Sequence, residues 1–181
     1  MTRALVLAAL MLALPSPLWA AGWGGIEPGQ TTLEDVRGRY GRPSRETRAK
    51  VQGYDTVQWI YEGSQAPPGL TRILVDFGIL IDKDYKPSVV RILRLEPKPL
   101  IFGRNTVIDG WGVPDGVSKV NEQETFFYKA GLLVTFDKEG QTAVVMNFTV
   151  PQPLAATSKP TTPSAPASGS APRPAPAQPR R

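Results

Sequence analysis

Two stretches of the chain share one pattern, and this pattern decides the predicted fold: VRGRYGRP at residues 36–43 and VIDGWGVP at residues 107–114. Each stretch contains a valine, three further residues, an aromatic residue, a glycine, one variable residue and a proline. Glycine tolerates the left-handed backbone that ends many helices, and a proline two residues later stops the helix from continuing. The pattern therefore predicts two short helices that end in the same way.

The residues before the first of these helix ends form a clear helix start. Thr31 is a candidate N-cap, and Glu34 follows it at the spacing of a capping box. Leu33, Val36 and Tyr40 lie three and four residues apart, so they share one face of a helix. The spacing therefore predicts a short helix with one apolar side.

Runs of β-branched and aromatic residues after each helix predict three strands in each half of the chain. The predicted strands span residues 56–62, 71–80, 88–96, 124–129, 132–137 and 142–150. Short turns between neighbouring strands force antiparallel pairing. We therefore expect an α+β fold in which two tandem helix-plus-antiparallel-meander repeats, residues 22–97 and a shorter 98–153, form a continuous sheet with the helices on one face.

The two ends of the chain differ in character from its middle. Residues 1–20 have the pattern of a secretory signal peptide, with Arg3, an apolar run and the small residue Ala20 at the predicted cleavage point. An uncleaved membrane anchor is the alternative, but prolines at positions 15 and 17 interrupt the ~20 apolar residues that a spanning helix needs. Residues 154–181 are rich in proline and alanine, which predicts a disordered basic tail.

The composition excludes several kinds of chemistry. The 181 residues include no cysteine and no histidine, which excludes a thiol nucleophile, a Ser-His-Asp triad and a zinc site of thiolate or imidazole ligands. No cofactor is expected.

The formal net charge of +5 comes from the two ends, and the middle of the chain is neutral. We therefore expect no nucleic-acid partner, although the basic tail could make weak contacts with a membrane or with cell-wall polymer.

The segment GIEPGQTTLEDV at residues 25–36, running into YGRP at residues 40–43, resembles the SmpA/OmlA (BamE-like) family of outer-membrane assembly lipoproteins. It is equally similar to the fold that this family shares with the β-lactamase inhibitor proteins. An aromatic strand around Trp59 and a Val-x-Phe strand ending at Phe77 then follow. The resemblance implies a protein-binding role in the bacterial envelope. Because the chain lacks the lipid-accepting cysteine of the lipoproteins, we expect a periplasmic or secreted protein without a lipid anchor.

Two pairs of aromatic residues form the candidate partner-binding site. Trp59 and Tyr61 share one side of a predicted strand, and Phe126 and Tyr128 share one side of another, because side chains alternate along a strand. On a continuous sheet the four could form an aromatic stripe on the open face, where a partner would bind. The alternative is that they pack beneath the helices as core, since large aromatic side chains are usually buried.

Two groups of charged residues are further candidates. Carboxylates could act as the acid and base of a glycosidase, although their spacing selects no pair and surface exposure is the alternative. Basic residues near the end of the first predicted helix could hold a phosphate or an acidic partner, or could be cations that favour a helix C-terminus. The carboxylates are Asp76, Asp82, Asp84, Glu122, Glu124 and Asp137, and the basic residues are Arg37, Arg39, Arg42, Arg45, Arg48 and Lys50.

These observations lead to three hypotheses about function. The first is a non-catalytic, exported protein-binding module of the bacterial envelope, whose partner is an envelope or secreted protein. The second is a proteinaceous inhibitor of a secreted enzyme. The third, from a different class, is a carboxylate-based hydrolase of cell-wall or other carbohydrate.

Overall fold

The computed structural model describes residues 21–120 and 122–151. The predicted signal peptide and the predicted tail lie outside the described residues. No helix in the described part of the chain combines the length and the apolar character needed to cross a membrane.

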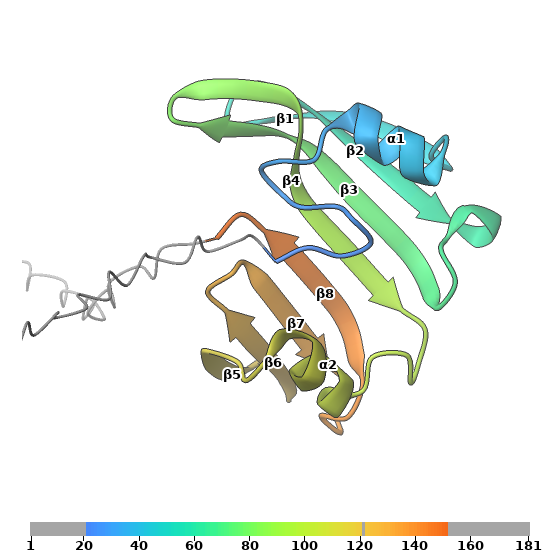
Figure 1. Cartoon of the computed structure of the whole chain (residues 1–181), viewed down its shortest axis with the longest axis vertical. Helices are drawn as coiled ribbons and strands as arrows, with labels where there is room; N and C mark the ends of the chain where they lie inside the picture. The colour runs from blue at the N-terminus through green and yellow to red at the C-terminus, as the bar shows by residue number, and fades with distance from the viewer. Residues whose placement is uncertain (1–20, 121, 152–181) are drawn as a thin grey trace, which may run out of the picture.

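Eight antiparallel strands form one sheet, in the order β1-β2-β3-β4-β8-β7-β6-β5 (Figure 1). The first half of the chain supplies α1 (Leu33–Tyr40), β1 (Arg45–Val51), β2 (Tyr54–Glu62), the short 3-10 helix η1 (Gly63–Gln65), β3 (Leu70–Ile81) and β4 (Asp84–Pro97). The second half supplies α2 (Arg104–Trp111), β5 (Gly116–Val120), β6 (Gln123–Tyr128), β7 (Leu132–Phe136) and β8 (Ala143–Thr149).

The prediction of an α+β fold made of two helix-plus-meander repeats is wrong. The described chain is mostly one eight-stranded antiparallel sheet, and each of its two α-helices has only eight residues. Each helix buries a single residue completely, Val36 in α1 and Val107 in α2. Two turns with one buried side chain cannot build a layer over eight strands, so the sheet, not a pair of helical units, organises the fold.

The sequence prediction also missed the two strands at the edges of the sheet. Residues 45–51 form β1, and every residue of that strand is exposed. Residues 116–120 form β5, which exposes four of its five residues. Neither strand alternates between apolar and polar side chains, because neither buries a face, and so neither carries the period-two signal that identifies a half-buried strand.

The start of α1 is displaced by one residue from its predicted position. Thr32, not Thr31, is the N-cap, and it forms a capping box with Asp35. The Thr32 hydroxyl accepts from the Asp35 backbone N–H at 3.3 Å, and the Asp35 carboxylate accepts from the Thr32 N–H at 2.9 Å. The Thr31 hydroxyl instead accepts a hydrogen bond from the backbone N–H of Glu27. Both helices end at the predicted glycines, Gly41 and Gly112.

The hydrophobic core lies between the sheet and the elements that cover one of its faces. Both helices lie on this face, and the chain segment at residues 21–32 crosses the sheet between them (Figure 1). Backbone hydrogen bonds fasten the segment at both ends: Ala21 donates to Ala130 at 2.7 Å, and Gly29 donates to Val90 at 2.8 Å. Ile26 in its middle is completely buried. The segment is therefore a third covering element, in addition to α1 and α2.

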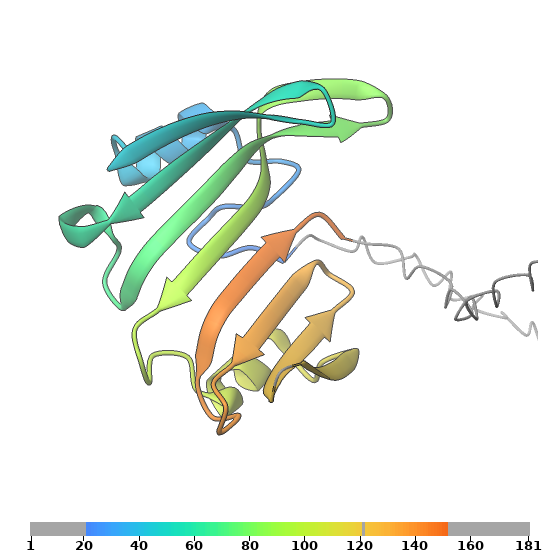
Figure 2. The same cartoon turned by 180° about the vertical axis from the view of Figure 1, so that it is seen from behind.

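The two halves of the chain meet at the centre of the sheet. Strand β4 pairs with β8, with Ile92 opposite Thr149 and Leu95 opposite Met146. Because the last strand of each half lies at the centre, the first strand of each half lies at an outer edge. The face of the sheet opposite the helices is covered by none of the described elements (Figure 2). We call it the open face.

Candidate functional site

One row of side chains crosses the open face over six neighbouring strands. Successive cross-strand pairs join Ile60 to Leu74, Leu74 to Arg94, Arg94 to Asn147, Asn147 to Leu133, and Leu133 to Phe127. Ile60 is buried by its neighbours, Arg94 is exposed, and the other four are partly exposed. Because side chains alternate along a strand, these residues lie on the side opposite the core. The row combines four apolar side chains with a guanidinium and an amide.

Charged residues lie next to this row at one end of the sheet. Arg72 contacts Glu96 at 2.7 Å, and the Glu96 carboxylate also contacts Arg94 at 3.3 Å. Glu96 is only 18% exposed, so this small network is partly shielded from water. The open face thus has an apolar row with a polar border, which is the composition of many protein-binding surfaces.

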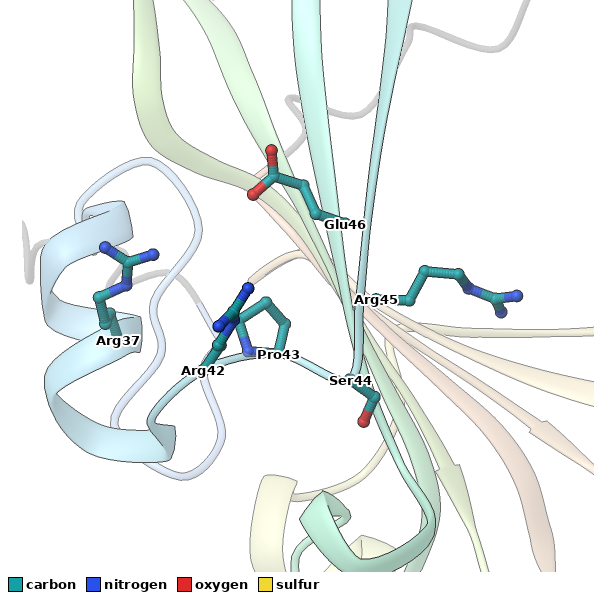
Figure 3. A pocket seen from close by; sticks show the side chains of 6 residues that line it. All are labelled: Arg37, Arg42, Pro43, Ser44, Arg45 and Glu46. Atoms are coloured by element: carbon teal, nitrogen blue, oxygen red, sulfur yellow. The ribbon is translucent and has the colours of Figure 1, made fainter.

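A second candidate site is a cleft of about 450 Å³ between α1 and β1. Its lining residues are Arg37, Arg42, Pro43, Ser44, Arg45 and Glu46. Figure 3 shows that Arg37, Arg42 and Glu46 lie on the helix side of β1, whereas Arg45 extends in the opposite direction. We call this cleft the basic cleft. Its helix wall comes from the last turn of α1, and its other wall comes from the first residues of β1.

Trp59 lies beneath the basic cleft and contacts two of its lining residues, Glu46 and Arg37. Its indole N–H donates a hydrogen bond to the Glu46 carboxylate at 3.0 Å. The Arg37 guanidinium lies over its ring, 5.4 Å from the centroid, a cation–π arrangement. The hydrogen bonds from Trp59 and then from Arg48 lower the pKa of the Glu46 carboxyl, which is therefore ionised at neutral pH.

The four aromatic residues predicted to bind a partner all lie in the core. Their exposed fractions are 1% for Trp59, 0% for Tyr61, 1% for Phe126 and 5% for Tyr128. They point toward the helices, so no aromatic stripe made of these residues lies on the open face. Both tyrosine hydroxyls are bonded within the protein, to the carbonyl oxygens of Gly41 and Gly112. The core alternative therefore describes their positions, and Trp59 contributes to a candidate site only from beneath the basic cleft.

Two of the carboxylates considered as a catalytic acid or base, Glu124 and Asp137, have other partners. Glu124 accepts a hydrogen bond from Arg104 at 2.7 Å, and this bond lowers its pKa. Asp137 accepts from the backbone N–H groups of Gln141 and Thr142, and these bonds lower its pKa as well. A general acid needs the opposite shift, toward a raised pKa. Within the described ranges no group of three acidic side chains is arranged to hold a metal ion.

The sequence analysis missed the open-face row. It identified the basic residues as a candidate site but did not predict that some of them line a cleft. The row is invisible in sequence because its members come from six strands whose pairing is not local. Arg37 and Arg42 were noted as part of a basic run, but Glu46 becomes their neighbour only because β1 returns alongside α1 (Figure 3).

Comparison with known proteins does not place the chain in a family. No family model matches it, and no curated protein matches it in sequence. A solved structure from Bacillus subtilis subsp. subtilis str. 168, a DUF4309 family protein (YjgB), is similar at a TM-score of 0.44 with 14% sequence identity, over 70% of this chain and 83% of that chain.

The expected membership of the SmpA/OmlA (BamE-like) family and of the β-lactamase-inhibitor-like fold is wrong, because no family model matches the chain. The quoted segment consists mainly of a helix cap, a C-terminal glycine and a following proline. Many short helices that lead into a strand carry these residue types, so the segment identifies a local structure and not a family.

Proposed function

We propose that the chain is a non-catalytic, exported protein-binding module of the bacterial envelope that binds its partner on the open face. The observation that carries the proposal is the open-face row, whose partly exposed apolar side chains are Leu74, Leu133 and Phe127, on a face that no described element covers. Burying apolar surface gains about 25 cal/mol of free energy for each Å² removed from water, and the uncovered face does not gain this energy within the described chain. A protein partner would bury it.

Two further features support this proposal. The N-terminal sequence pattern is that of an exported protein. The Arg72–Glu96–Arg94 network holds charged groups in place beside the apolar row, where they would favour partners with matching polar groups and exclude others.

Site-specific photo-crosslinking tests the proposal. A photoreactive residue is placed at Leu133 on the open face, and in a control variant at Asp109 on the exposed side of α2. Both variants are irradiated in envelope fractions and in culture medium, and the adducts are identified by mass spectrometry. We expect a protein adduct from position 133 and none from position 109.

The identity of the adduct separates the two binding hypotheses. An outer-membrane or periplasmic protein would support an envelope module, and a single secreted enzyme would indicate an inhibitor. In a matched pull-down, Phe127→Ala should weaken capture about tenfold, as expected for an aromatic contact residue, and Val113→Ala should not, since Val113 lies off the open face. Equal adducts from positions 133 and 109, or none from either, would contradict the proposal.

A further inference from the structure

The two halves of the chain place different residues at equivalent positions beside the helix ends. In the shared pattern, Arg37 corresponds to Ile108 and Arg42 to Val113. Both helices end at a glycine with positive φ, +74° at Gly41 and +83° at Gly112, and each glycine carbonyl accepts from a tyrosine hydroxyl. The same local scaffold therefore carries two guanidinium groups at one end of the sheet and none at the other.

The helix dipole does not account for these arginines. Cations near a helix C-terminus are favourable, and the last turn of α1 contains Arg37 and Arg39. Helix α2 has the same length as α1 and also ends at a glycine, but its last turn contains no basic residue. A helix of this kind can thus end without them. Arg37 is also held over the Trp59 ring, whereas Arg42 makes no hydrogen bond, ion pair or cation–π contact among those found in the described residues.

Of the three arginines that line the basic cleft, Arg45 is paired with Glu62 at 3.7 Å, whereas Arg37 and Arg42 form no ion pair in the described part of the chain. The ion pairs found there include neither Arg37 nor Arg42. Glu46, the one acidic residue of the lining, already accepts from Trp59 at 3.0 Å and from Arg48 at 3.1 Å. The cleft is therefore a concave surface of about 450 Å³ that carries two guanidinium groups outside any ion pair, together with the Glu46 carboxylate. A guanidinium presents a fork of N–H donors that matches a carboxylate.

The basic surface continues from the cleft to the open face. Arg45 lines the cleft, but its side chain extends to the other side of β1 (Figure 3). Its cross-strand partner is Ile60, the first residue of the open-face row. A protein bound on the open face would thus meet Arg45, which is paired with Glu62 at 3.7 Å, at the β1 edge beside the cleft.

We propose that the basic cleft binds an acidic segment of the protein partner, with carboxylates held by Arg37 and Arg42. This inference rests on the proposed function, because the partner is the one that binds the open face. Arg45 at the edge of β1 provides the link between the two surfaces.

The test is a titration followed by NMR, which detects weak binding. The chain from Ala21 to Arg181 is titrated with capped hexaglutamate, with capped hexaglutamine as the neutral control, and with inorganic phosphate. The variant Arg37→Ile/Arg42→Val carries the residues of the equivalent positions in the second half, so the scaffold is expected to accept them. The variant Lys86→Gln/Lys98→Gln removes the same charge from exposed positions outside the cleft.

We expect hexaglutamate to shift the backbone amide signals of Ser44 and Glu46, which line the cleft and are present in every variant, and to do so less at high salt. The shifts should be lost in Arg37→Ile/Arg42→Val and retained in Lys86→Gln/Lys98→Gln. Equal shifts with hexaglutamine, equal loss in both variants, or binding of phosphate at least as tight as that of hexaglutamate would overturn the inference.

The pull-down separates failure of this inference from failure of the proposed function. Arg37→Ile/Arg42→Val should reduce capture of the partner about tenfold. If this variant captures the partner as well as the unmodified chain does, while Phe127→Ala does not, the cleft inference fails and the open-face proposal stands.

Discussion

The hydroxyl of Tyr61 on β2 donates a hydrogen bond to the carbonyl oxygen of Gly41 at the end of α1, over 3.2 Å. The second half has the same relationship, with Tyr128 on β6 donating to Gly112 at the end of α2 over 3.1 Å. The last carbonyl groups of a helix lack partners within the helix, and a buried hydroxyl needs an acceptor. One bond meets both needs and fastens each helix to the sheet.

Replacing Tyr61 by Phe should destabilise the fold by about 1 kcal/mol, because the hydrogen bond is lost and the aromatic ring is kept. Tyr128→Phe should have a similar effect. Urea denaturation followed by circular dichroism measures the change. Tyr54→Phe is the matched control, since the exposed Tyr54 donates no hydrogen bond among those found in the described residues. A Tyr61→Phe variant as stable as the Tyr54→Phe variant would contradict the proposed fastening.

The ionisation of Tyr61 should make the fold sensitive to alkali. Burial raises the pKa of Tyr61 from its ordinary value of 10.0 to about 12. Between these values the unfolded chain loses the proton and the folded chain keeps it, so stability is complete below about pH 10 and falls as the pH rises toward 12. Absorbance of tyrosinate against pH measures the titration. Tyr61→Phe should remove the last group to ionise, and a titration in which all tyrosines ionise together near pH 10 would refute the assignment.

Shortening Ile26 to Ala should destabilise the protein by about 2–4 kcal/mol, because this side chain is completely buried and its loss leaves a cavity. The result would show that the segment at residues 21–32 is part of the folded core. Thermal or urea unfolding gives the value. The control is Ile101→Ala, which should cost less than about 1 kcal/mol since Ile101 is 46% exposed. Equal effects of the two variants would argue against a structural role for the segment.

Two glycines should respond in opposite ways to replacement by Ala. Gly131 has φ of +95°, and a methyl group there would collide with the backbone carbonyl of Thr149, so we expect a loss of about 2 kcal/mol or more. Gly110 lies within α2 with no atom near its missing side chain, so Ala should stabilise the helix by up to about 1 kcal/mol. Paired unfolding curves test both signs. A Gly131→Ala protein of unchanged stability would contradict the close approach of β8.

The predictions of individual helices and strands succeeded best where they depended only on residues close together in the sequence. The helix ends at Gly41 and Gly112 follow from the special conformational freedom of glycine and from the proline two residues later. The interior strands follow from alternating β-branched and aromatic side chains. The N-cap of α1 was placed one residue early because Thr31 and Thr32 can both serve as caps, and each has an acidic residue at the required spacing.

The candidate sites required contacts that no local pattern reports. Trp59 and Tyr61 share a side of β2, as alternation predicted, but only the packing of α1 shows that this is the buried side. The charged strand β1 lies at an edge, where like charges and full exposure discourage pairing with other chains. Its sequence therefore looks like a loop, and the cleft that it forms with α1 could not be expected.

The sequence by itself determined the local structure and the chemistry that the chain cannot perform. Without cysteine or histidine it has no thiol or imidazole groups, and its glycine and proline positions set where the helices end. Only the tertiary structure decided that β4 pairs with β8, that residues 21–32 cross the core face, and that Arg37, Arg42 and Glu46 surround one cleft. Backbone preferences depend on adjacent residues, whereas these contacts depend on which distant surfaces bury the most apolar area together.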